Sequence, residues 1–408
     1  MQIAVHDYAG HVFQFDLSRA LARRGHVVRH FFFADDIGPK GPAQTSVDDP
    51  PTLSIEPISI GVPYSKGDFL RRRNGDVHYG RVAAKAIAAF RPDVVISGNT
   101  PLDAQQQIFR ESRKSGAAFI FWMQDFYSLA IERLLGRRWM GAGALAAAYY
   151  KWVEGRLLRD SDGIVLISED FVRPLTTFNA PADRVSIIPN WGALDTIPQR
   201  PKDNPWSRKH GLEDRFVFLY SGTLALKHNP DWLWALASAF RDDPEVVVVL
   251  GAAGVSYDAL KRREATEPQP NLMFLPLQPA ADLPDLLAAA DVTIGLLEHD
   301  AGEFSVPSKV LSYLCAGRAI LLAAPQANLA ARMVTRAEAG LVVSADDEAA
   351  FLVEARRLRA DKALRDRFGR SARTYAETTF EIEAVADRFE AAFTKARAQR
   401  LRVPASAA

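Results

Sequence analysis

A loop followed by a helix, within residues 299–321, has the residue types of an anion-binding site. The loop carries Glu303, a helix is expected to begin near Pro307, and Lys309 lies one turn later. The free N–H groups and the positive dipole at a helix start favour a phosphate, and a lysine would add charge. Gly317 is expected to end the helix. An ordinary loop and helix with a surface carboxylate would have the same sequence, so both interpretations stay open at this point.

A second candidate is the segment YSGTLALKHNPD at 220–231, expected at a strand-to-helix turn. Gly222 would allow the backbone to approach a ligand closely. Lys227 could place an ammonium over a diphosphate, whose negative charge grows as a glycosidic bond breaks. A solvated loop lysine is the alternative interpretation. Gly10 lies at the matching turn of the first half of the chain, where glycine is common in any Rossmann-like sheet.

The elements that would position these residues are apolar runs separated by helical segments. The runs lie at 2–8, 26–33, 92–98, 117–125, 162–168, 216–222, 245–251, 271–277, 291–297 and 319–324. Strands that are apolar on both faces and alternate with helices indicate parallel sheets with helices on both sides. We therefore predict an α/β fold with domains at 1–190 and 212–375. A linker would occupy 191–211, and 376–408 would hold a helix that packs back on the first domain, with a disordered tail. Residues 364–400 are expected to form one long helix.

The composition excludes several classes of protein. The 408-residue chain has one cysteine, Cys315, so it forms neither an internal disulfide nor a thiolate metal cluster. Its eight histidines lack the spacing of a metal site, and a net charge of +1 argues against a nucleic-acid partner. The N-terminus does not resemble a secretory signal, and no apolar run approaches the ~20 residues that span a bilayer. We expect a cytoplasmic protein that needs no metal or other cofactor.

A set of short motifs runs in order through the chain from about residue 1 to 390 and resembles one known family. The motifs are HDYAGH with LSRALARRGHVV, WMQD, DGIVLISEDF, VSIIPNW, YSGTLALKHNPD, LPDLLAAADVTIGLL, VPSKVLSYLCAGRAIL and AGLVV. The chain resembles glycosyltransferase family 4, a GT-B group of retaining enzymes, and above all its WbuB- and WcaI-like bacterial polysaccharide branch. The resemblance implies two Rossmann-like domains that face each other across a cleft, with a C-terminal helix crossing back.

The resemblance also implies a function. The chain would be a hexosyltransferase that moves a hexose or N-acetylhexosamine from a nucleoside-diphosphate sugar, with UDP favoured, to a saccharide on a lipid carrier. The pathway would be the biosynthesis of a cell-surface polysaccharide, such as a lipopolysaccharide or exopolysaccharide. Two rivals remain open: a UDP-sugar 2-epimerase, which shares this architecture, and a non-catalytic sugar-binding protein with two α/β lobes.

The family's functional residues map onto particular positions of this chain. The resemblance gives catalytic roles to Lys227 on the diphosphate, Glu303 on the donor sugar and Asp125 on the sugar and acceptor. The residues that it assigns to the donor nucleotide sugar are Gly10, His11, Gly222, Thr223, Lys227, Leu277, Gln278, Glu303, Ser308, Lys309 and Ser312. No residue is assigned to a metal. The base would meet the backbone around 276–278.

The chain departs from the family pattern at two places. Many members have an arginine where this chain has Thr223, which removes one cation from the expected pair. Members also have paired glutamates, whereas here Ser312 occupies the second position and Glu303 lies one residue off register for the first. The ribose contact and the role of Glu303 therefore depart from the common pattern.

The segment 132–159 is basic and contains interleaved aromatic residues, among them Trp139, Tyr149, Tyr150 and Trp152. Such a segment could lie on an anionic membrane, because basic and aromatic side chains favour the interface. This would place the protein at the inner face of the plasma membrane, close to a lipid-linked acceptor. A helix pair with aromatic residues in its core and arginines outside is the alternative.

Overall fold

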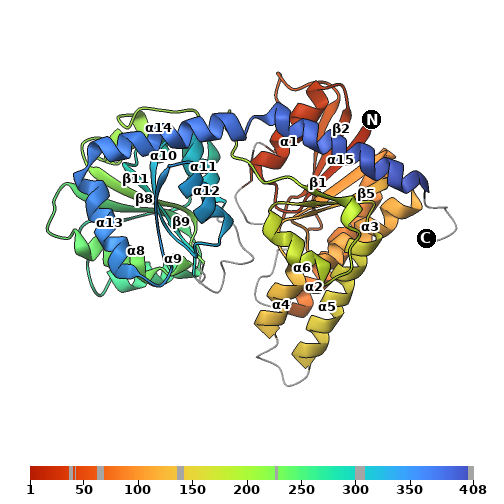
Figure 1. Cartoon of the computed structure of the whole chain (residues 1–408), viewed down its shortest axis with the longest axis horizontal. Coiled ribbons are helices and arrows are strands. Elements are labelled where there is room, and N and C mark those ends of the chain that lie inside the picture. The colour runs from red at the N-terminus through yellow and green to blue at the C-terminus, as the bar shows by residue number, and fades with distance from the viewer. Residues whose placement is uncertain are drawn as a thin grey trace. The chain divides into compact units, whose positions relative to one another are not determined.

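The computed structural model describes residues 1–35, 40–41, 43–61, 69–135, 142–225, 228–298 and 308–402. The chain divides into two compact units, one formed by Met1–Asn190 with Ile382–Ala408 and the other by Trp191–Glu381. Each unit is built on its own parallel sheet with helices around it (Figure 1). The predicted α/β fold with two Rossmann-like domains is confirmed.

The first unit contains a seven-stranded sheet in the order β3-β2-β1-β4-β5-β6-β7, with every neighbouring pair parallel. Its strands are β1 (Gln2–Asp7), β2 (Val27–Phe33), β3 (Leu53–Ile58), β4 (Val94–Gly98), β5 (Ala118–Met123), β6 (Gly163–Leu166) and β7 (Val185–Ile187). Strands β4, β5 and β6 are buried along their whole length, as the apolar runs predict. The strand order reverses between β1 and β4. The carboxyl ends of these strands therefore form a switch point, where α/β sheets bind ligands.

Helices surround this first sheet. They are α1 (Val12–Arg23), α2 (Phe69–Phe90), α3 (Leu102–Lys114), α4 (Tyr127–Leu135), α5 (Ala142–Asp160), α6 (Val172–Thr176) and α15 (Ile382–Arg402). Helix α15 packs on α1 and on β4, β5 and β6, whereas α2 packs on α3 and α3 on α5. Helices α4 and α5 lie side by side and extend away from the sheet (Figure 1). The hairpin of α4 and α5 thus presents part of its surface to solvent.

Charged side chains join α15 to the end of α1. Arg24 directly follows α1, and its guanidinium donates to three carboxylates of α15, those of Glu383 (2.8 Å), Asp387 (2.6 Å) and Glu390 (2.7 Å). On the same helix, Phe389 is fully buried and packs against an indole ring of β5, with ring centroids 4.9 Å apart. The C-terminal helix is therefore held on the first unit by ion pairs and by core packing.

The second unit contains a six-stranded parallel sheet in the order β10-β9-β8-β11-β12-β13. Its strands are β8 (Phe216–Thr223), β9 (Val246–Ala253), β10 (Leu272–Leu275), β11 (Val292–Leu296), β12 (Ala319–Ala323) and β13 (Gly340–Val343). Its helices are α7 (Pro205–Lys209), α8 (Asp231–Ala239), α9 (Val255–Glu264), α10 (Leu283–Ala288), α11 (Lys309–Ala316), α12 (Leu329–Arg336), α13 (Glu348–Ala360) and α14 (Lys362–Thr379). The order reverses between β8 and β11, so this sheet also has a switch point.

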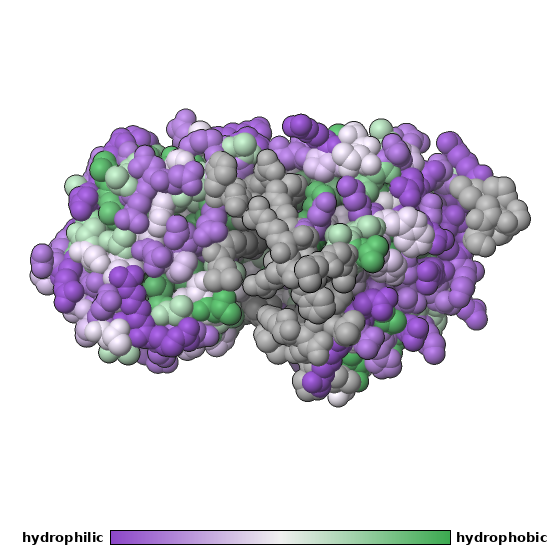
Figure 2. All heavy atoms as spheres, turned by 90° about the horizontal axis from the view of Figure 1, so that it is seen from below, coloured by the Kyte–Doolittle hydropathy of each residue, from purple (hydrophilic) through white to green (hydrophobic). Residues whose placement is uncertain are grey.

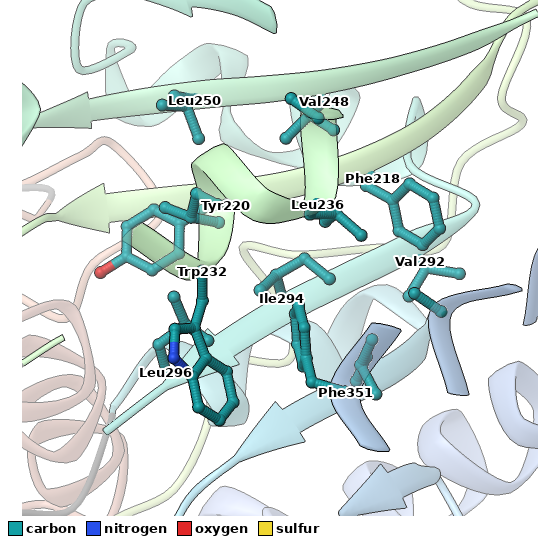
Figure 3. Close-up of a cluster of buried hydrophobic side chains, with 14 of the residues drawn as sticks. Phe218, Tyr220, Trp232, Leu236, Val248, Leu250, Val292, Ile294, Leu296 and Phe351 are labelled. Carbon is teal, nitrogen blue, oxygen red and sulfur yellow. The ribbon is translucent and has the colours of Figure 1, made fainter. Parts of the chain in front are cut away.

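Large side chains fill the space between the second sheet and its helices. Phe218 and Tyr220 of β8 and Ile294 of β11 meet Trp232 of α8 and Phe351 of α13 (Figure 3). Burying a side chain of this size contributes about 2–3 kcal/mol. The Tyr220 hydroxyl points away from the cluster in Figure 3. The core thus fixes the carboxyl ends of β8 and β11 and leaves one polar group of β8 at their edge.

Three details differ from the sequence-based expectations. The expected single helix at 364–400 is two helices, α14 and α15, separated at 380–381, and they belong to different units. Strands β3 and β7 were not predicted, because one is an edge strand containing Pro57 and the other has only three residues. The segment expected as a linker packs on the second unit, where Ile197 and Trp206 are buried and Lys202 contacts Asp291.

On the face that Figure 2 shows, the coloured surface is largely hydrophilic, and hydrophobic side chains appear in small separate groups. Within the described ranges, no helix has both the length and the apolar character that a membrane crossing requires.

Candidate functional site

Residues distant in sequence meet at the switch point of the second sheet. Gly222 and Thr223 end β8, and Lys309 begins α11 in the connection that follows β11. Gly222 has a φ of 109°, a conformation that favours glycine. A Cβ at this position would lie 3.7 Å from Cε of Lys309. The structure therefore brings together Gly222, Thr223 and Lys309, three of the residues that are predicted to bind the donor.

The Lys309 ammonium is fixed by the end of β8. Its Nζ atom donates to the Tyr220 hydroxyl (2.6 Å) and to the Thr223 carbonyl (3.5 Å), and it lies 4.2 Å from the Tyr220 ring centroid. The Tyr220 hydroxyl in turn donates to the Thr223 carbonyl (2.9 Å). Burial raises the pKa of Tyr220, so this phenol is neutral and does not cancel the charge of the ammonium.

Helix α11 is tied to both central strands. Tyr313 of this helix is fully buried, and its hydroxyl accepts from the Ser221 amide (3.1 Å) and donates to the Ile294 carbonyl (3.2 Å). Burial raises the pKa of Tyr313, which keeps this donor protonated. Gly317 ends the helix with a φ of 64°, as predicted. The start of α11 is thus held at the switch point.

The two predicted serines lie on this helix start. Ser308 precedes α11, is exposed, and its side chain does not cap the helix. Ser312 is half-buried one turn later, and residues four apart share a helix face. The first amides of α11 are therefore not capped by the hydroxyl of Ser308.

Leu277 and Gln278 follow β10, which is two strands away from β8 in the sheet. Neighbouring strands are about 5 Å apart, so this loop lies about 10 Å from the end of β8. The Gln278 amide accepts from the Trp206 indole N–H (3.2 Å) and donates to the Pro276 carbonyl (2.8 Å). The side chain thus orders its own loop, and the contact of this loop's backbone with the base stays a prediction.

Two of the predicted catalytic residues, Lys227 and Glu303, lie outside the residues that the structure describes. Their roles stay predictions. The expected helix start at Pro307 also lies outside, and the described helix begins at Lys309.

The switch point of the first unit carries the other predicted turn. Gly10 has a φ of 73°, and His11 precedes α1 with a half-buried ring. The buried carboxylate of Asp7 accepts from the amides of Ala9 (3.1 Å) and His11, and it lies 3.3 Å from His11 Nδ1. Burial would raise the pKa of Asp7, but the charge and hydrogen bonds of His11 hold it below its usual range. Asp7 therefore stays ionised and orients the imidazole.

Asp125 lies in the loop between β5 and α4, at the same edge of the sheet, and is half-buried. Beneath it, the fully buried carboxylate of Glu154 on α5 accepts from the amides of Tyr127 (3.0 Å) and Ser128 (3.2 Å) and from the Ser128 hydroxyl. Burial raises the pKa of Glu154 to about 7, and the negative charge of Asp125 adds to the shift. Glu154 thus caps α4 from another helix and holds the loop that carries Asp125.

The described aromatic residues of the segment 132–159 divide between the core and the surface. Tyr150 is buried, whereas Leu145, Tyr149 and Trp152 of α5 are 75%, 38% and 52% exposed. Their spacing of four and three residues places them on one face of the helix. Arg73 of α2 lies on the same surface, with its guanidinium 5.9 Å from the Tyr149 ring centroid. Trp139 lies outside the described residues.

Several residues at these sites were not predicted from the sequence. They are Asp7, Asn99, Tyr127, Glu154 and Tyr220. Asp7 and Asn99 directly follow or end buried strands, and a polar residue at the end of such a strand is a usable signal. For Glu154 and Tyr220 no sequence signal exists, because one looks like an ordinary helix carboxylate and the other like a core aromatic residue.

No cluster of three or more histidine, cysteine, aspartate or glutamate side chains suited to a metal was found in the described part of the chain.

Two family models match the chain. A glycosyl transferase 4-like domain covers residues 11–191, and the glycosyl transferases group 1 model covers residues 202–375. The chain belongs to the family 4-like glycosyltransferases. The predicted family and the enzyme class, a hexosyltransferase, are confirmed by these matches and by the relatives below.

Relatives of this glycosyltransferase include the putative colanic acid biosynthesis glycosyl transferase WcaI of Escherichia coli K12, 23% identical over 304 residues, which are 74% of this chain and 73% of WcaI. Among solved structures, sucrose-phosphate synthase of Thermosynechococcus elongatus has a TM-score of 0.71 at 15% identity, covering 98% of this chain and 99% of that one. HepE of Anabaena with UDP and glucose has a TM-score of 0.69 at 13% identity, covering 97% and 99%. WaaG, a glycosyltransferase of lipopolysaccharide biosynthesis, has a TM-score of 0.65 at 17% identity, covering 96% and 98%. These structures share the GT-B fold with this glycosyltransferase.

Proposed function

We propose that this glycosyltransferase moves a hexose or N-acetylhexosamine from UDP to a lipid-linked saccharide, with retention of the anomeric configuration. The product would enter the biosynthesis of a cell-surface polysaccharide. WcaI is described as a putative enzyme of colanic acid biosynthesis and WaaG as an enzyme of lipopolysaccharide biosynthesis, and both descriptions support this class of pathway. The solved complex of HepE with UDP-glucose supports UDP as the nucleotide.

The observation that carries the proposal is the ammonium of Lys309, fixed beside Gly222 at the switch point of the second sheet. A cation, the start of a helix and a glycine that exposes backbone are the groups that bind a diphosphate. The loop at 276–278 lies about 10 Å away across the sheet, a span that suits the nucleoside joined to that diphosphate. Lys227 would add a second cation.

The reaction needs no nucleophile from the protein. An acceptor hydroxyl attacks the anomeric carbon from the face of the leaving group, so the new C–O bond forms as the bond to the diphosphate breaks. The bonding electrons go to the departing phosphate oxygen, and the hydroxyl proton is transferred to it. Lys309, Lys227 and the amides of α11 would stabilise the charge that develops there.

The test measures product and donor binding together. Wild-type protein is incubated with UDP-glucose or UDP-N-acetylglucosamine and a polyprenyl diphosphate that carries one sugar, and the anomeric configuration is read by NMR. We expect an α-linked product from these α-linked donors. A β-linked product would contradict the proposal. So would the absence of product with either donor together with no binding of UDP, GDP or ADP by calorimetry.

A matched pair of lysine variants tests the site. Lys227→Ala should lower turnover about 100-fold without loss of fold, because removal of one preorganised group that stabilises developing charge has this effect. Lys261→Ala, which removes an exposed lysine of α9, should leave turnover unchanged. Near-normal turnover in Lys227→Ala would refute the assignment. Conversion of the UDP-sugar itself without an acceptor would favour the epimerase.

The exposed face of α5 supports a second part of the proposal, contact with an anionic membrane. This face, which we call the α5 face, consists of Leu145, Tyr149 and Trp152, with Arg73 and Arg156 beside them. Apolar and aromatic side chains bordered by arginines suit the interface of an anionic bilayer. We place the protein in the cytoplasm, at the inner face of the plasma membrane, where a lipid-linked acceptor resides.

Vesicle sedimentation tests the α5 face. We expect wild-type protein to bind phosphatidylcholine vesicles that contain phosphatidylglycerol more strongly than pure phosphatidylcholine vesicles. Trp152→Ala should reduce this binding, whereas Val353→Ala, at a position of α13 that is 59% exposed, should not. Equal binding by both variants, or no binding by the wild type, would contradict the contact.

A further inference from the structure

Three polar side chains meet at the carboxyl ends of three neighbouring strands of the first unit. His11 follows β1, Asn99 follows β4 and Tyr127 follows β5, and these strands are adjacent in the order β1-β4-β5. The Tyr127 hydroxyl lies 3.4 Å from Asn99 Oδ1, and Asn99 Nδ2 lies 3.5 Å from His11 Nδ1. The three side chains form a polar row across the switch point of this sheet.

The backbone of Asn99 is in an unusual conformation. Its φ is 49°, in the left-handed region that costs most residues other than glycine, although asparagine tolerates it better than most. Buried hydrogen bonds on either side hold this turn: the Ser97 hydroxyl donates to Gln105 Oε1 (2.6 Å), and the Thr100 hydroxyl donates to the Gly98 carbonyl (2.7 Å). Residues held in such conformations by their surroundings cluster at binding and active sites.

The buried histidine behind this turn strengthens the same conclusion. His6 is fully buried, with its ring nitrogens 2.8 Å from the Ser97 and Tyr79 hydroxyls and Nδ1 3.2 Å from the Thr100 hydroxyl. Burial lowers the pKa of His6 to about 4, so the ring is neutral near pH 7 and links the surrounding hydroxyl groups through hydrogen bonds. A fully satisfied buried network of this kind makes the turn rigid. The hydrogen-bonded network therefore holds Asn99 in a fixed position within the polar row.

The contacts within the row are long. Hydrogen bonds from hydroxyl groups are strongest at about 2.7–2.8 Å, and contacts of 3.4 and 3.5 Å are weak. A ligand hydroxyl that lies between these side chains would make shorter bonds to them. Each sugar hydroxyl donates one bond and accepts two, and the amide, phenol and imidazole groups offer both donors and acceptors. The chemistry of the row suits a neutral polyol.

We propose that Asn99 and Tyr127, beside the predicted donor residue His11, bind hydroxyl groups of the acceptor saccharide. Asn99 is a binding residue, and Asp7 is a positioning residue because it orients the His11 ring. This inference rests on the proposed glycosyl transfer and adds Asn99 and Tyr127 as residues that bind the acceptor sugar.

Two asparagines with nearly the same backbone conformation provide a matched test. Asn179 of the first unit has a φ of 53° in an exposed turn after α6, so Asn179→Ala has a backbone cost similar to that of Asn99→Ala. Steady-state kinetics are measured with UDP-sugar and a polyprenyl diphosphate that carries one sugar. We expect Asn99→Ala to raise the acceptor KM about tenfold with the donor KM unchanged, and Asn179→Ala to change neither.

Two further variants keep the test decisive if Asn99→Ala folds poorly. Asn99→Gly keeps the backbone relaxed but lacks the amide, so its acceptor KM should rise as in the alanine variant. Tyr127→Phe removes only the hydroxyl and should raise the acceptor KM about threefold. If wild-type protein transfers sugar and the Asn99 variants keep a normal acceptor KM, this inference is wrong and the proposed function stands. Failure of the wild type to bind UDP or transfer sugar would instead overturn the proposed function.

Discussion

The titration of Glu154 should make the stability of the protein depend on pH near neutrality. Its carboxyl group is fully buried and accepts hydrogen bonds from the start of α4. Burial raises the pKa of this group, and the negative charge of Asp125 raises it further. The pKa is raised from 4.5 to about 7, so the folded chain keeps this proton at pH values where the unfolded chain has lost it. Between these pH values the free energy of unfolding must fall as pH rises.

The size of the effect follows from the same shift. A rise of the pKa from 4.5 to about 7 lowers the free energy of unfolding by about 3 kcal/mol as the pH rises through these two values. Glu154→Gln has the shape of the protonated acid and does not titrate. The free energy of unfolding of the wild type, minus that of Glu154→Gln, should therefore decrease by about 3 kcal/mol from pH 4.5 to pH 7.5.

Urea unfolding of both proteins across this pH range measures the difference. Glu169→Gln, which changes an exposed carboxylate of the same unit, serves as the control for the loss of one acidic group. The reasoning is refuted if the difference between the wild type and Glu154→Gln stays constant across the range. It is also refuted if Glu169→Gln produces the same change with pH.

Other features of the structure give further predictions. Arg24→Ala should lower the free energy of unfolding by about 1–2 kcal/mol at low salt and by less at high salt, because salt screens the ion pairs with α15. Equal losses at low and high salt, measured by calorimetry, would count against this. Gly222→Ala should weaken UDP binding about tenfold, since it strains the backbone beside Lys309, whereas Gly211→Ala, also at positive φ but in open space, should leave the affinity unchanged. Tyr220→Phe should weaken UDP binding about threefold, and calorimetry with unchanged affinity would show that its hydroxyl does not position the ammonium.

The sequence predicted the parts of the fold that depend on local pattern. The fully buried β4 and β5 are recognisable because they are largely apolar and each strand is buried on both faces. Edge strand β3 escaped prediction, since most of its residues are only partly buried or exposed and it contains Pro57. The break at 380–381 also escaped, because the helical pattern continues on both sides and only the tertiary packing assigns α14 and α15 to different units.

The candidate site was predictable where the chemistry lies in a motif. Gly222 and Lys309 were predicted from the loops at the ends of β8 and β11, and a Cβ at Gly222 would lie 3.7 Å from Cε of Lys309. The hydroxyl of Tyr220 could not be assigned, because its ring belongs to the core and only the tertiary structure shows that it contacts the ammonium. Asn99 could not be assigned either, since it contacts residues that follow β1 and β5, and these contacts depend on strand order.

A crystal structure of the full chain with UDP tests the central claim most directly. The account predicts that the diphosphate lies at the end of β8, within hydrogen-bonding distance of Lys309 Nζ and of the first amides of α11. UDP bound elsewhere on the chain, with the space beside Gly222 and Lys309 empty, would contradict it.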